Sequence, residues 1–305
     1  MPLVASALVP IVLLIALGLA LRRSRFLPEP FWPGLDRLNY WVFFPSLIFV
    51  SLAGADSGLV GTGPVGLAVW GGLAATAGAA LLLGRIATAD GPAFTSVFQG
   101  SIRFNSYVAF IVVPTLFPGS EALTALLVAL TVPVVNVASV VVLARHASSA
   151  PLRWRTLLTS VASNPLILAS LLGVGASRLA VPLGPFEAAL TTLGQASLAS
   201  GLLSVGAILR FGEIRASVRP IAVSTALKAV ILPATTFAFA TALGLPTSTT
   251  GPLIVFQALP TAPASYVLAK AMGGDGDLMA AILAVHTVAA MAWLPLAFAL
   301  LGPLA

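Results

Sequence analysis

Long apolar runs separated by short polar stretches dominate the pattern along the chain. A helix crosses the roughly 30 Å hydrocarbon core of a bilayer with about 20 mostly apolar residues. Divided at charge clusters and at Pro and Gly positions, the pattern predicts ten such spans. They are Leu3–Leu21, Leu38–Ala53, Thr62–Gly84, Ala93–Phe117, Ala122–Ala144, Leu157–Ser177, Ala188–Leu209, Pro220–Gly244, Pro252–Ala271 and Leu278–Leu301. The first run has no basic region before it and three arginines after it, so we interpret it as a retained span and not as a signal peptide.

The composition of the 305 residues agrees with a membrane protein. Apolar residues make up 59% of the chain, charged residues 8%, and the mean hydropathy is +1.06. A soluble domain carries about 25% charged residues, because its surface must be solvated. The composition therefore excludes a soluble enzyme or a nucleic-acid-binding protein. The absence of Cys excludes disulfides, thiol catalysis and Cys-ligated metal.

The basic residues predict the orientation of the spans, because cytoplasmic loops of membrane proteins collect Lys and Arg. The loops after the even-numbered spans contain Arg178 alone, whereas Arg103 and Lys228 lie inside spans. The loops after the odd-numbered spans contain Arg22, Arg23, Arg25, Arg37, Arg85, Arg145, Arg153, Arg155, Arg210, Arg215, Arg219 and Lys270. This asymmetry predicts a multi-pass protein of the cell (inner) membrane with both termini extracytoplasmic.

The two halves of the chain, residues 1–150 and 151–305, resemble each other at an offset of about 156 residues. This offset aligns span 1 with span 6 and continues in order to spans 5 and 10. It also places Thr131 on Thr287. Since each half contains five spans, the halves enter the membrane in opposite orientations, as in the inverted repeats of secondary transporters. The alternative is chance spacing of similar apolar segments.

Spans 4 and 9 are interrupted at equivalent places. Arg103 and Asn105 fall near the middle of span 4, where a charge costs about 3 kcal/mol or more. Pro260 and Pro263 fall in the middle of span 9, where each removes an N–H and clashes with the preceding turn. Irregular backbone at membrane depth is tolerated only inside protein or beside a water-filled cavity. We therefore predict broken helices.

Each break would expose a helix N-terminus, near Tyr107 and Ala264, whose N–H groups and dipole attract an anion. Asn105 and Thr261 are suitable N-cap residues that can also hydrogen-bond a carboxylate. The alternatives are a merely kinked, packed span 9 and an Asn105 that bonds a neighbouring helix. The candidate substrate-binding residues are Arg103, Asn105, Ser106, Pro260, Thr261, Ala262 and Pro263.

The whole chain resembles the auxin efflux carrier family of transporters, and a bacterial-type member in particular, because only about a dozen residues link spans 5 and 6. The motifs that carry the resemblance are Arg103-Phe104-Asn105-Ser106, Leu227-Lys228-Ala229-Val230-Ile231-Leu232-Pro233, Pro260-Thr261-Ala262, Gly273-Gly274-Asp275, His286-Thr287 and Leu294-Pro295-Leu296. The resemblance implies an all-α fold like that of bile-acid/sodium symporters and NhaA-type antiporters. It further implies a scaffold of spans 1, 2, 6 and 7, and a transport domain of spans 3–5 and 8–10 that moves as an elevator. Its substrates would be small organic anions, either dicarboxylates such as malate or malonate or auxin-like acids.

The remaining polar residues of the spans indicate support and packing. All nine Asp and Glu residues fall in loops or at span ends, which argues against a cation antiporter. We expect Lys228, His286, Thr131 and Thr287 to support the transport domain or its conformational change. Small residues of span 7, including Ser200, Gly201 and Gly206, would allow close helix packing. Weaker candidates for lining a pocket are Gln195, Asn39, Pro45 and Ser46.

Two other classes of function compete with a carrier. An intramembrane enzyme needs paired acids, a metal motif or an activated nucleophile. The spans offer only a Ser with Lys228, so we expect no catalytic residue, no metal and no cofactor. A channel or a receptor on the same fold is the third class. The expected partners are a small organic anion and the lipid bilayer, with no nucleic acid, and the sequence allows a homodimer.

Overall fold

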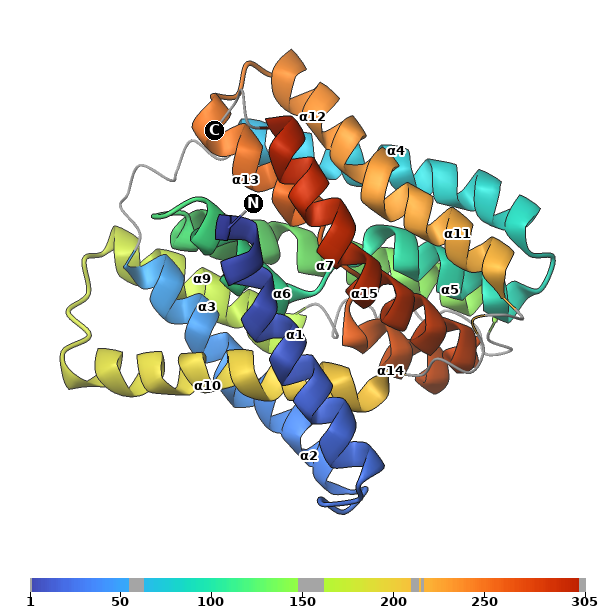
Figure 1. Ribbon diagram of the computed structural model, residues 1–305. Helices are drawn as coiled ribbons and strands as arrows, with labels where there is room; N and C mark the ends of the chain where they lie inside the picture. Colours follow the sequence, from blue (N-terminus) through green and yellow to red (C-terminus); the bar gives the residue numbers. More distant parts are fainter. Residues whose placement is uncertain (1, 55–62, 148–161, 210–213, 215–216, 302–305) are drawn as a thin grey trace. The chain divides into compact units, whose positions relative to one another are not determined.

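The computed structural model describes residues 2–54, 63–147, 162–209, 214 and 217–301. Every element within these ranges is helical, as the sequence predicts (Figure 1). The predicted loop residues Arg153, Arg155, Arg210 and Arg215 lie outside the described residues. In chain order the elements are α1 (Pro2–Arg23), α2 (Phe31–Leu38), η1 (Asn39–Phe43), α3 (Phe44–Ala53), α4 (Gly63–Ala87), α5 (Gly91–Ile102), α6 (Ser106–Leu116), α7 (Glu121–His146), α9 (Pro165–Arg178), α10 (Pro185–Ile208), α11 (Val218–Ala226), η3 (Leu227–Ile231), α12 (Leu232–Ala242), α13 (Thr247–Gln257), α14 (Pro263–Ala271) and α15 (Gly276–Leu301), of which η1 and η3 are π-helical turns.

Five helices within the described residues are long and apolar enough to cross a membrane. They are Gly63–Ala87, Glu121–His146, Pro185–Ile208, Val218–Ala242 and Gly276–Ala299. These helices fall on predicted spans 3, 5, 7, 8 and 10 and support a membrane protein. The total of ten spans stays a prediction, because the other five predicted spans do not meet the same criterion of length and composition within the described residues.

Backbone contacts divide the chain into two compact units, and each unit draws segments from both halves of the sequence. The first unit comprises Met1–Thr62, Tyr107–Pro133 and Trp154–Ile208. The second comprises Gly63–Ser106, Val134–Arg153 and Leu209–Ala305. The boundary predicted near residue 150 divides two sequence repeats and does not coincide with this division into compact units.

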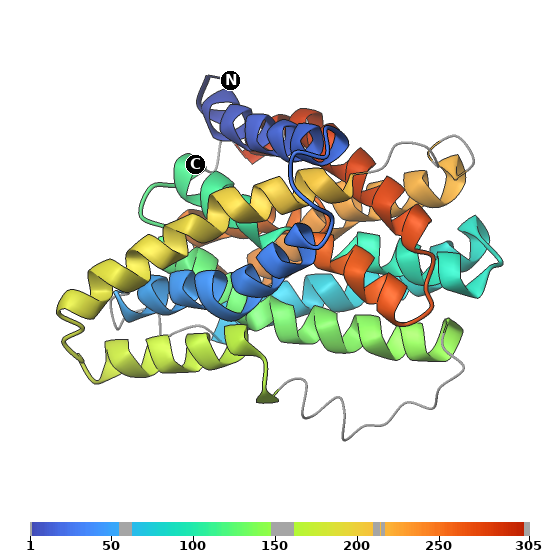
Figure 2. The same cartoon turned by 90° about the horizontal axis from the view of Figure 1, so that it is seen from below.

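Small residues hold the helices of the first unit together. In this unit α1 packs against α10, and α3 packs against both α9 and α10 (Figures 1 and 2). Gly206 of α10 lies directly against the backbone of Ile15 in α1, and Gly18 of α1 lies against Leu203. A side chain at either glycine would overlap the opposite backbone. The predicted packing role of Gly206 is therefore confirmed.

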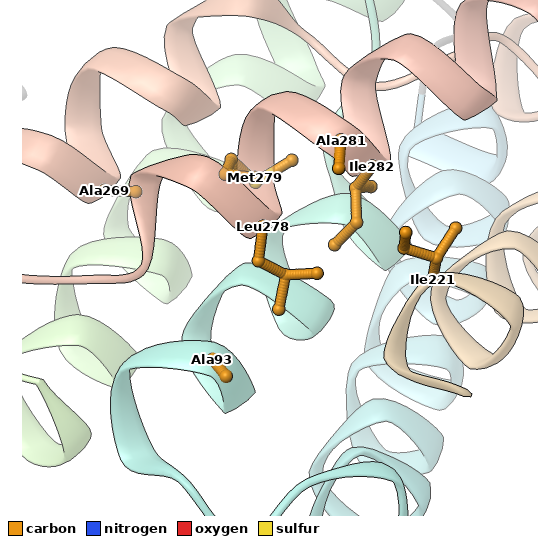
Figure 3. Close-up of a cluster of buried hydrophobic side chains, with 7 residues drawn as sticks. All are labelled: Ala93, Ile221, Ala269, Leu278, Met279, Ala281 and Ile282. Carbon is orange, nitrogen blue, oxygen red and sulfur yellow. The ribbon is translucent and has the colours of Figure 1, made fainter. Parts of the chain in front are cut away.

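In the second unit, α5 packs against α4, α11 and α15, and α4 also packs against α12. Figure 3 shows part of its apolar core, to which α5, α11, α14 and α15 contribute. The start of α5 is capped by Asp90, whose carboxylate accepts from the Ala93 amide at 2.8 Å. Asp275 caps α15 in the same way, and its carboxylate accepts from the Leu278 amide at 2.9 Å. These caps satisfy amide groups that have no partner within the helix.

Candidate functional site

The first interruption lies between α5 and α6. The last helical bond of α5 runs from the Arg103 amide to the Gln99 carbonyl at 2.9 Å. Arg103 itself is extended, with φ −82° and ψ 155°. Residues 103–105 are not helical, and α6 begins at Ser106, one residue before the predicted start.

The second interruption lies between α13 and α14. The chain leaves α13 after Gln257 and re-enters a helix at Pro263. Proline suits this first helical position, because it has no N–H to satisfy and its φ is already close to the helical value. The N-cap is Ala262, with φ −83° and ψ 144°, and not Thr261 as predicted. The cause is that the proline fixes the helix start one residue later than the sequence alignment of the halves suggests.

The two interrupted stretches contact each other within the second unit. The Asn105 amide donates to the Pro260 carbonyl at 2.7 Å. The ring of Phe104 packs against the ring of Phe256 with centroids 4.5 Å apart. The two non-helical stretches are therefore joined by a backbone hydrogen bond, and the contact between these two rings joins the first stretch to the end of α13. The partner carbonyl could not be identified from sequence, because the pairing joins residues far apart along the chain.

Trp293 of α15 holds the end of α13 in place. Its indole N–H donates to the Ala258 carbonyl at 2.8 Å, and its ring lies edge-on to His286 at 5.5 Å. Ala258 is the C-cap of α13, so this bond partners a carbonyl at a helix end. Sequence reasoning missed Trp293. An indole N–H within an apolar span usually finds an acceptor, which is the signal that could have indicated its role.

The candidate residues at the interruptions are mostly buried and carry hydrogen-bond donors. Arg103 is 6% exposed, Asn105 1% and Thr261 0%, whereas Ser106, Ala262 and Pro263 are partly exposed. The hydroxyl groups of Thr261 and Ser265 lie 3.5 Å apart. Among the described residues, the buried charged side chains are Arg103 and Lys228, and no Asp or Glu is buried. This distribution favours a negatively charged ligand over a cation.

The predicted support residues do not form one group. Lys228 in η3 and His286 in α15 both belong to the second unit and are fully buried. Thr287 belongs to the same unit, and its hydroxyl donates to the Leu283 carbonyl of its own helix at 2.7 Å. Thr131 is buried in the first unit. Thr131 and Thr287 occupy equivalent positions in the two sequence halves but belong to different compact units.

The residues predicted to line a pocket from span 2 are placed in the first unit. Asn39 lies in the π-helical turn η1, and its side-chain oxygen accepts from the Ser200 hydroxyl at 2.8 Å. The Ser46 hydroxyl donates to the Val42 carbonyl of its own helix. Ser200 therefore bonds across to η1 in addition to being a small packing residue, whereas Gln195 is exposed.

These features describe a helical protein with helices apolar and long enough to cross a membrane, and with buried polar residues in two non-helical stretches. A family model described as membrane transport protein matches residues 154–298. The matched segment includes Lys228, residues 260–263 and His286, and it begins after Arg103–Ser106. No curated protein matches the chain. The family match supports a membrane transporter, in agreement with the resemblance found in the sequence.

Proposed function

We propose that the chain is a secondary transporter that moves a small organic anion, a carboxylate, across the cell membrane by an elevator-type mechanism. The hydrogen bond between the Asn105 amide and the Pro260 carbonyl is the observation that carries this proposal. It joins two non-helical stretches in the buried interior of the second unit. Buried irregular backbone with donors and without acids suits an anion that must leave water.

The fold of this proposal is a ten-span, five-plus-five inverted repeat with broken helices 4 and 9. Its support is the spacing of the helices. Gly91 and Thr247, which start α5 and α13, are 156 residues apart. Ser106 and Pro263, which start α6 and α14, are 157 residues apart. These intervals agree with the offset of about 156 residues that aligns the two sequence halves.

The composition of the two units supports a scaffold and a moving domain. The first unit contains α1, α2, α3, α9 and α10, which correspond to predicted spans 1, 2, 6 and 7. The second contains α4, α5 and α11–α15, which correspond to span 3, the first part of span 4 and spans 8–10. In this proposal the second unit carries the anion. The N-terminal half of α7 and most of α6 belong to the first unit, whereas the resemblance implies that spans 4 and 5 belong wholly to the transport domain.

The proposed binding residues act on the carboxylate in different ways. The Asn105 side chain and the Thr261 hydroxyl donate hydrogen bonds, and the positive end of the α14 dipole adds attraction. Pro260 and Pro263 keep the second helix open. Arg103 supplies a formal charge next to Asn105, while Ser106 and Ala262 present backbone at the helix starts. A hydrogen bond to a charged group contributes about 1.5–3 kcal/mol, so these two donors would provide a large part of the free energy of carboxylate binding.

Transport by the purified protein tests this proposal. Proteoliposomes would be screened for uptake of radiolabelled mono- and dicarboxylates. We expect saturable uptake of at least one carboxylate and its loss in Asn105→Ala. Asn164→Ala is the matched control, because Asn164 is also a buried asparagine at a helix start but only caps α9. Flux that rises without saturation would indicate a channel instead, and absence of flux for every carboxylate would contradict the proposal.

A further inference from the structure

Lys228 is the most unusual charged residue of the second unit. Its side chain is fully buried in the π-helical turn η3, and its ammonium nitrogen has no hydrogen-bond partner among the described residues. No Asp or Glu is among the buried residues that the structure describes. A buried ammonium without an acceptor destabilises the folded state, because its lost hydration is not replaced by hydrogen bonds or by an opposite charge. The proposed carboxylate site does not use this group.

Helices α11 and α15 pack side by side before they reach Lys228 and His286. Ile221 of α11 lies in one apolar cluster with Leu278 of α15 (Figure 3). Further along, Ser224 of α11 and Ile282 of α15 both lie against Gly100 of α5. The two helices therefore run side by side in the same direction. One helical turn further along, the two helices reach Lys228 and His286, which are both fully buried.

The packed helices α5, α11 and α15 carry, near this level, further polar side chains without a hydrogen-bond partner in the described part of the chain. The Ser224 hydroxyl, both ring nitrogens of His286 and the side-chain amide of Gln99 have no hydrogen-bond partner among the described residues. Gln99 precedes Gly100 on α5. All three side chains are fully buried. An ammonium, a hydroxyl, an imidazole N–H and an amide N–H together present four kinds of donor and one formal positive charge.

We propose that Lys228, Ser224, His286 and Gln99 bind a small monovalent inorganic anion, with chloride as the ligand. One ammonium is matched by one negative charge, and the hydroxyl and N–H donors replace the hydration of the ion. Chloride is a single atom and needs no room for an organic group. Gly100 is required here, because a side chain at this position would overlap the Ser224 hydroxyl and push it out of the site. The chloride site shares no residue with the proposed carboxylate site, so this inference goes beyond the proposed function.

Equilibrium binding of radioactive chloride to the purified protein tests the inference. The buffer contains gluconate as the only other anion. We expect one saturable chloride per chain and a thermal midpoint that rises with chloride. Lys228→Met should remove both effects and remain folded, since replacing an unpaired buried charge by an apolar side chain of similar size is often neutral or stabilising. The control is Lys270→Met, because Lys270 is an exposed lysine beside the Tyr266 ring.

A second variant, Ser224→Ala, tests chloride binding at this site if Lys228→Met does not fold. Ser224→Ala should weaken chloride binding roughly tenfold, the effect of losing one hydrogen bond to an ion. Absence of saturable binding in the wild type, or unchanged binding in Lys228→Met or Ser224→Ala, would overturn the inference. Competition between chloride and a transported carboxylate would also overturn it, because the sites would then be one. Chloride binding without carboxylate transport would leave the inference intact and refute the proposed function.

Discussion

The contact between α1 and α10 gives a direct test of the packing in the first unit. At Gly206 an added Cβ would overlap the carbonyl oxygen of Ile15 and lie 2.8 Å from its carbonyl carbon. It would also lie 2.8 Å from the amide nitrogen of Leu19, although real Cβ atoms essentially never approach heavy atoms closer than 3.0 Å. All these neighbours are backbone atoms, which no rotamer change can move. Gly206→Ala therefore requires the two helices to separate.

The expected magnitude follows from two opposing effects. An overpacked site costs typically 1–3 kcal/mol, and more when no side chain can adjust. The change from Gly to Ala within a helix gains about 0.8–1.0 kcal/mol from its propensity. The atoms that obstruct a side chain at Gly206 are backbone atoms, so we expect an overpacking cost in the upper part of this range. The net loss in the free energy of unfolding is then about 1–2 kcal/mol.

Thermal unfolding of the purified protein in detergent, followed by tryptophan fluorescence, measures this loss. Gly175→Ala is the matched control, since Gly175 lies in α9 and no heavy atom lies within 4 Å of its added Cβ. We expect Gly206→Ala to unfold several degrees below the wild type and Gly175→Ala to unfold at or above it. Equal midpoints for the two variants would refute the close contact between α1 and α10.

Two further predictions concern orientation and the segment after α13. Ser248→Cys should react with an impermeant maleimide added to intact cells, whereas Ala89→Cys should react only after permeabilisation, because the charge asymmetry places these exposed residues on opposite sides of the membrane. The reverse labelling pattern would refute the predicted orientation. Trp293→Phe keeps the ring beside His286 but removes the donor to Ala258, so it should lower the stability by about 1 kcal/mol and slow carboxylate uptake. Unchanged uptake would show that this bond does not hold the site in place.

Much of the fold was predictable from sequence, because apolar run length and proline positions act locally. Pro263 marks the start of α14, and Asp275 marks the start of α15. The starts of these two helices differ from the predicted positions by one and two residues, respectively. The division into two compact units could not be predicted from the sequence. Helix α7 contributes to both units, and its apolar pattern continues unchanged through the boundary at Pro133.

The candidate site was predictable as a set of residue types but not as a set of contacts. Arg103, Asn105 and Thr261 stand out because polar groups are costly within apolar spans. The pairing of Asn105 with Pro260 depends on backbone geometry, which side-chain patterns do not encode. The same holds for Trp293, whose acceptor lies on a different helix. Hydrogen bonds between residues far apart along the chain can be identified only from the three-dimensional structure.

Carboxylate binding to purified Asn105→Ala tests the central claim most directly. Scintillation proximity or calorimetric titration would use the carboxylate that gives saturable uptake, with Asn164→Ala and Thr124→Ala as controls for asparagine and threonine substitutions. Thr124 is buried in α7, and its hydroxyl donates to the carbonyl of Ser120, the residue before this helix. We expect affinity to fall roughly ten- to a hundredfold in Asn105→Ala and in Thr261→Ala, and to stay within twofold in the controls. Wild-type affinity in both Asn105→Ala and Thr261→Ala would contradict a binding site at the two helix interruptions.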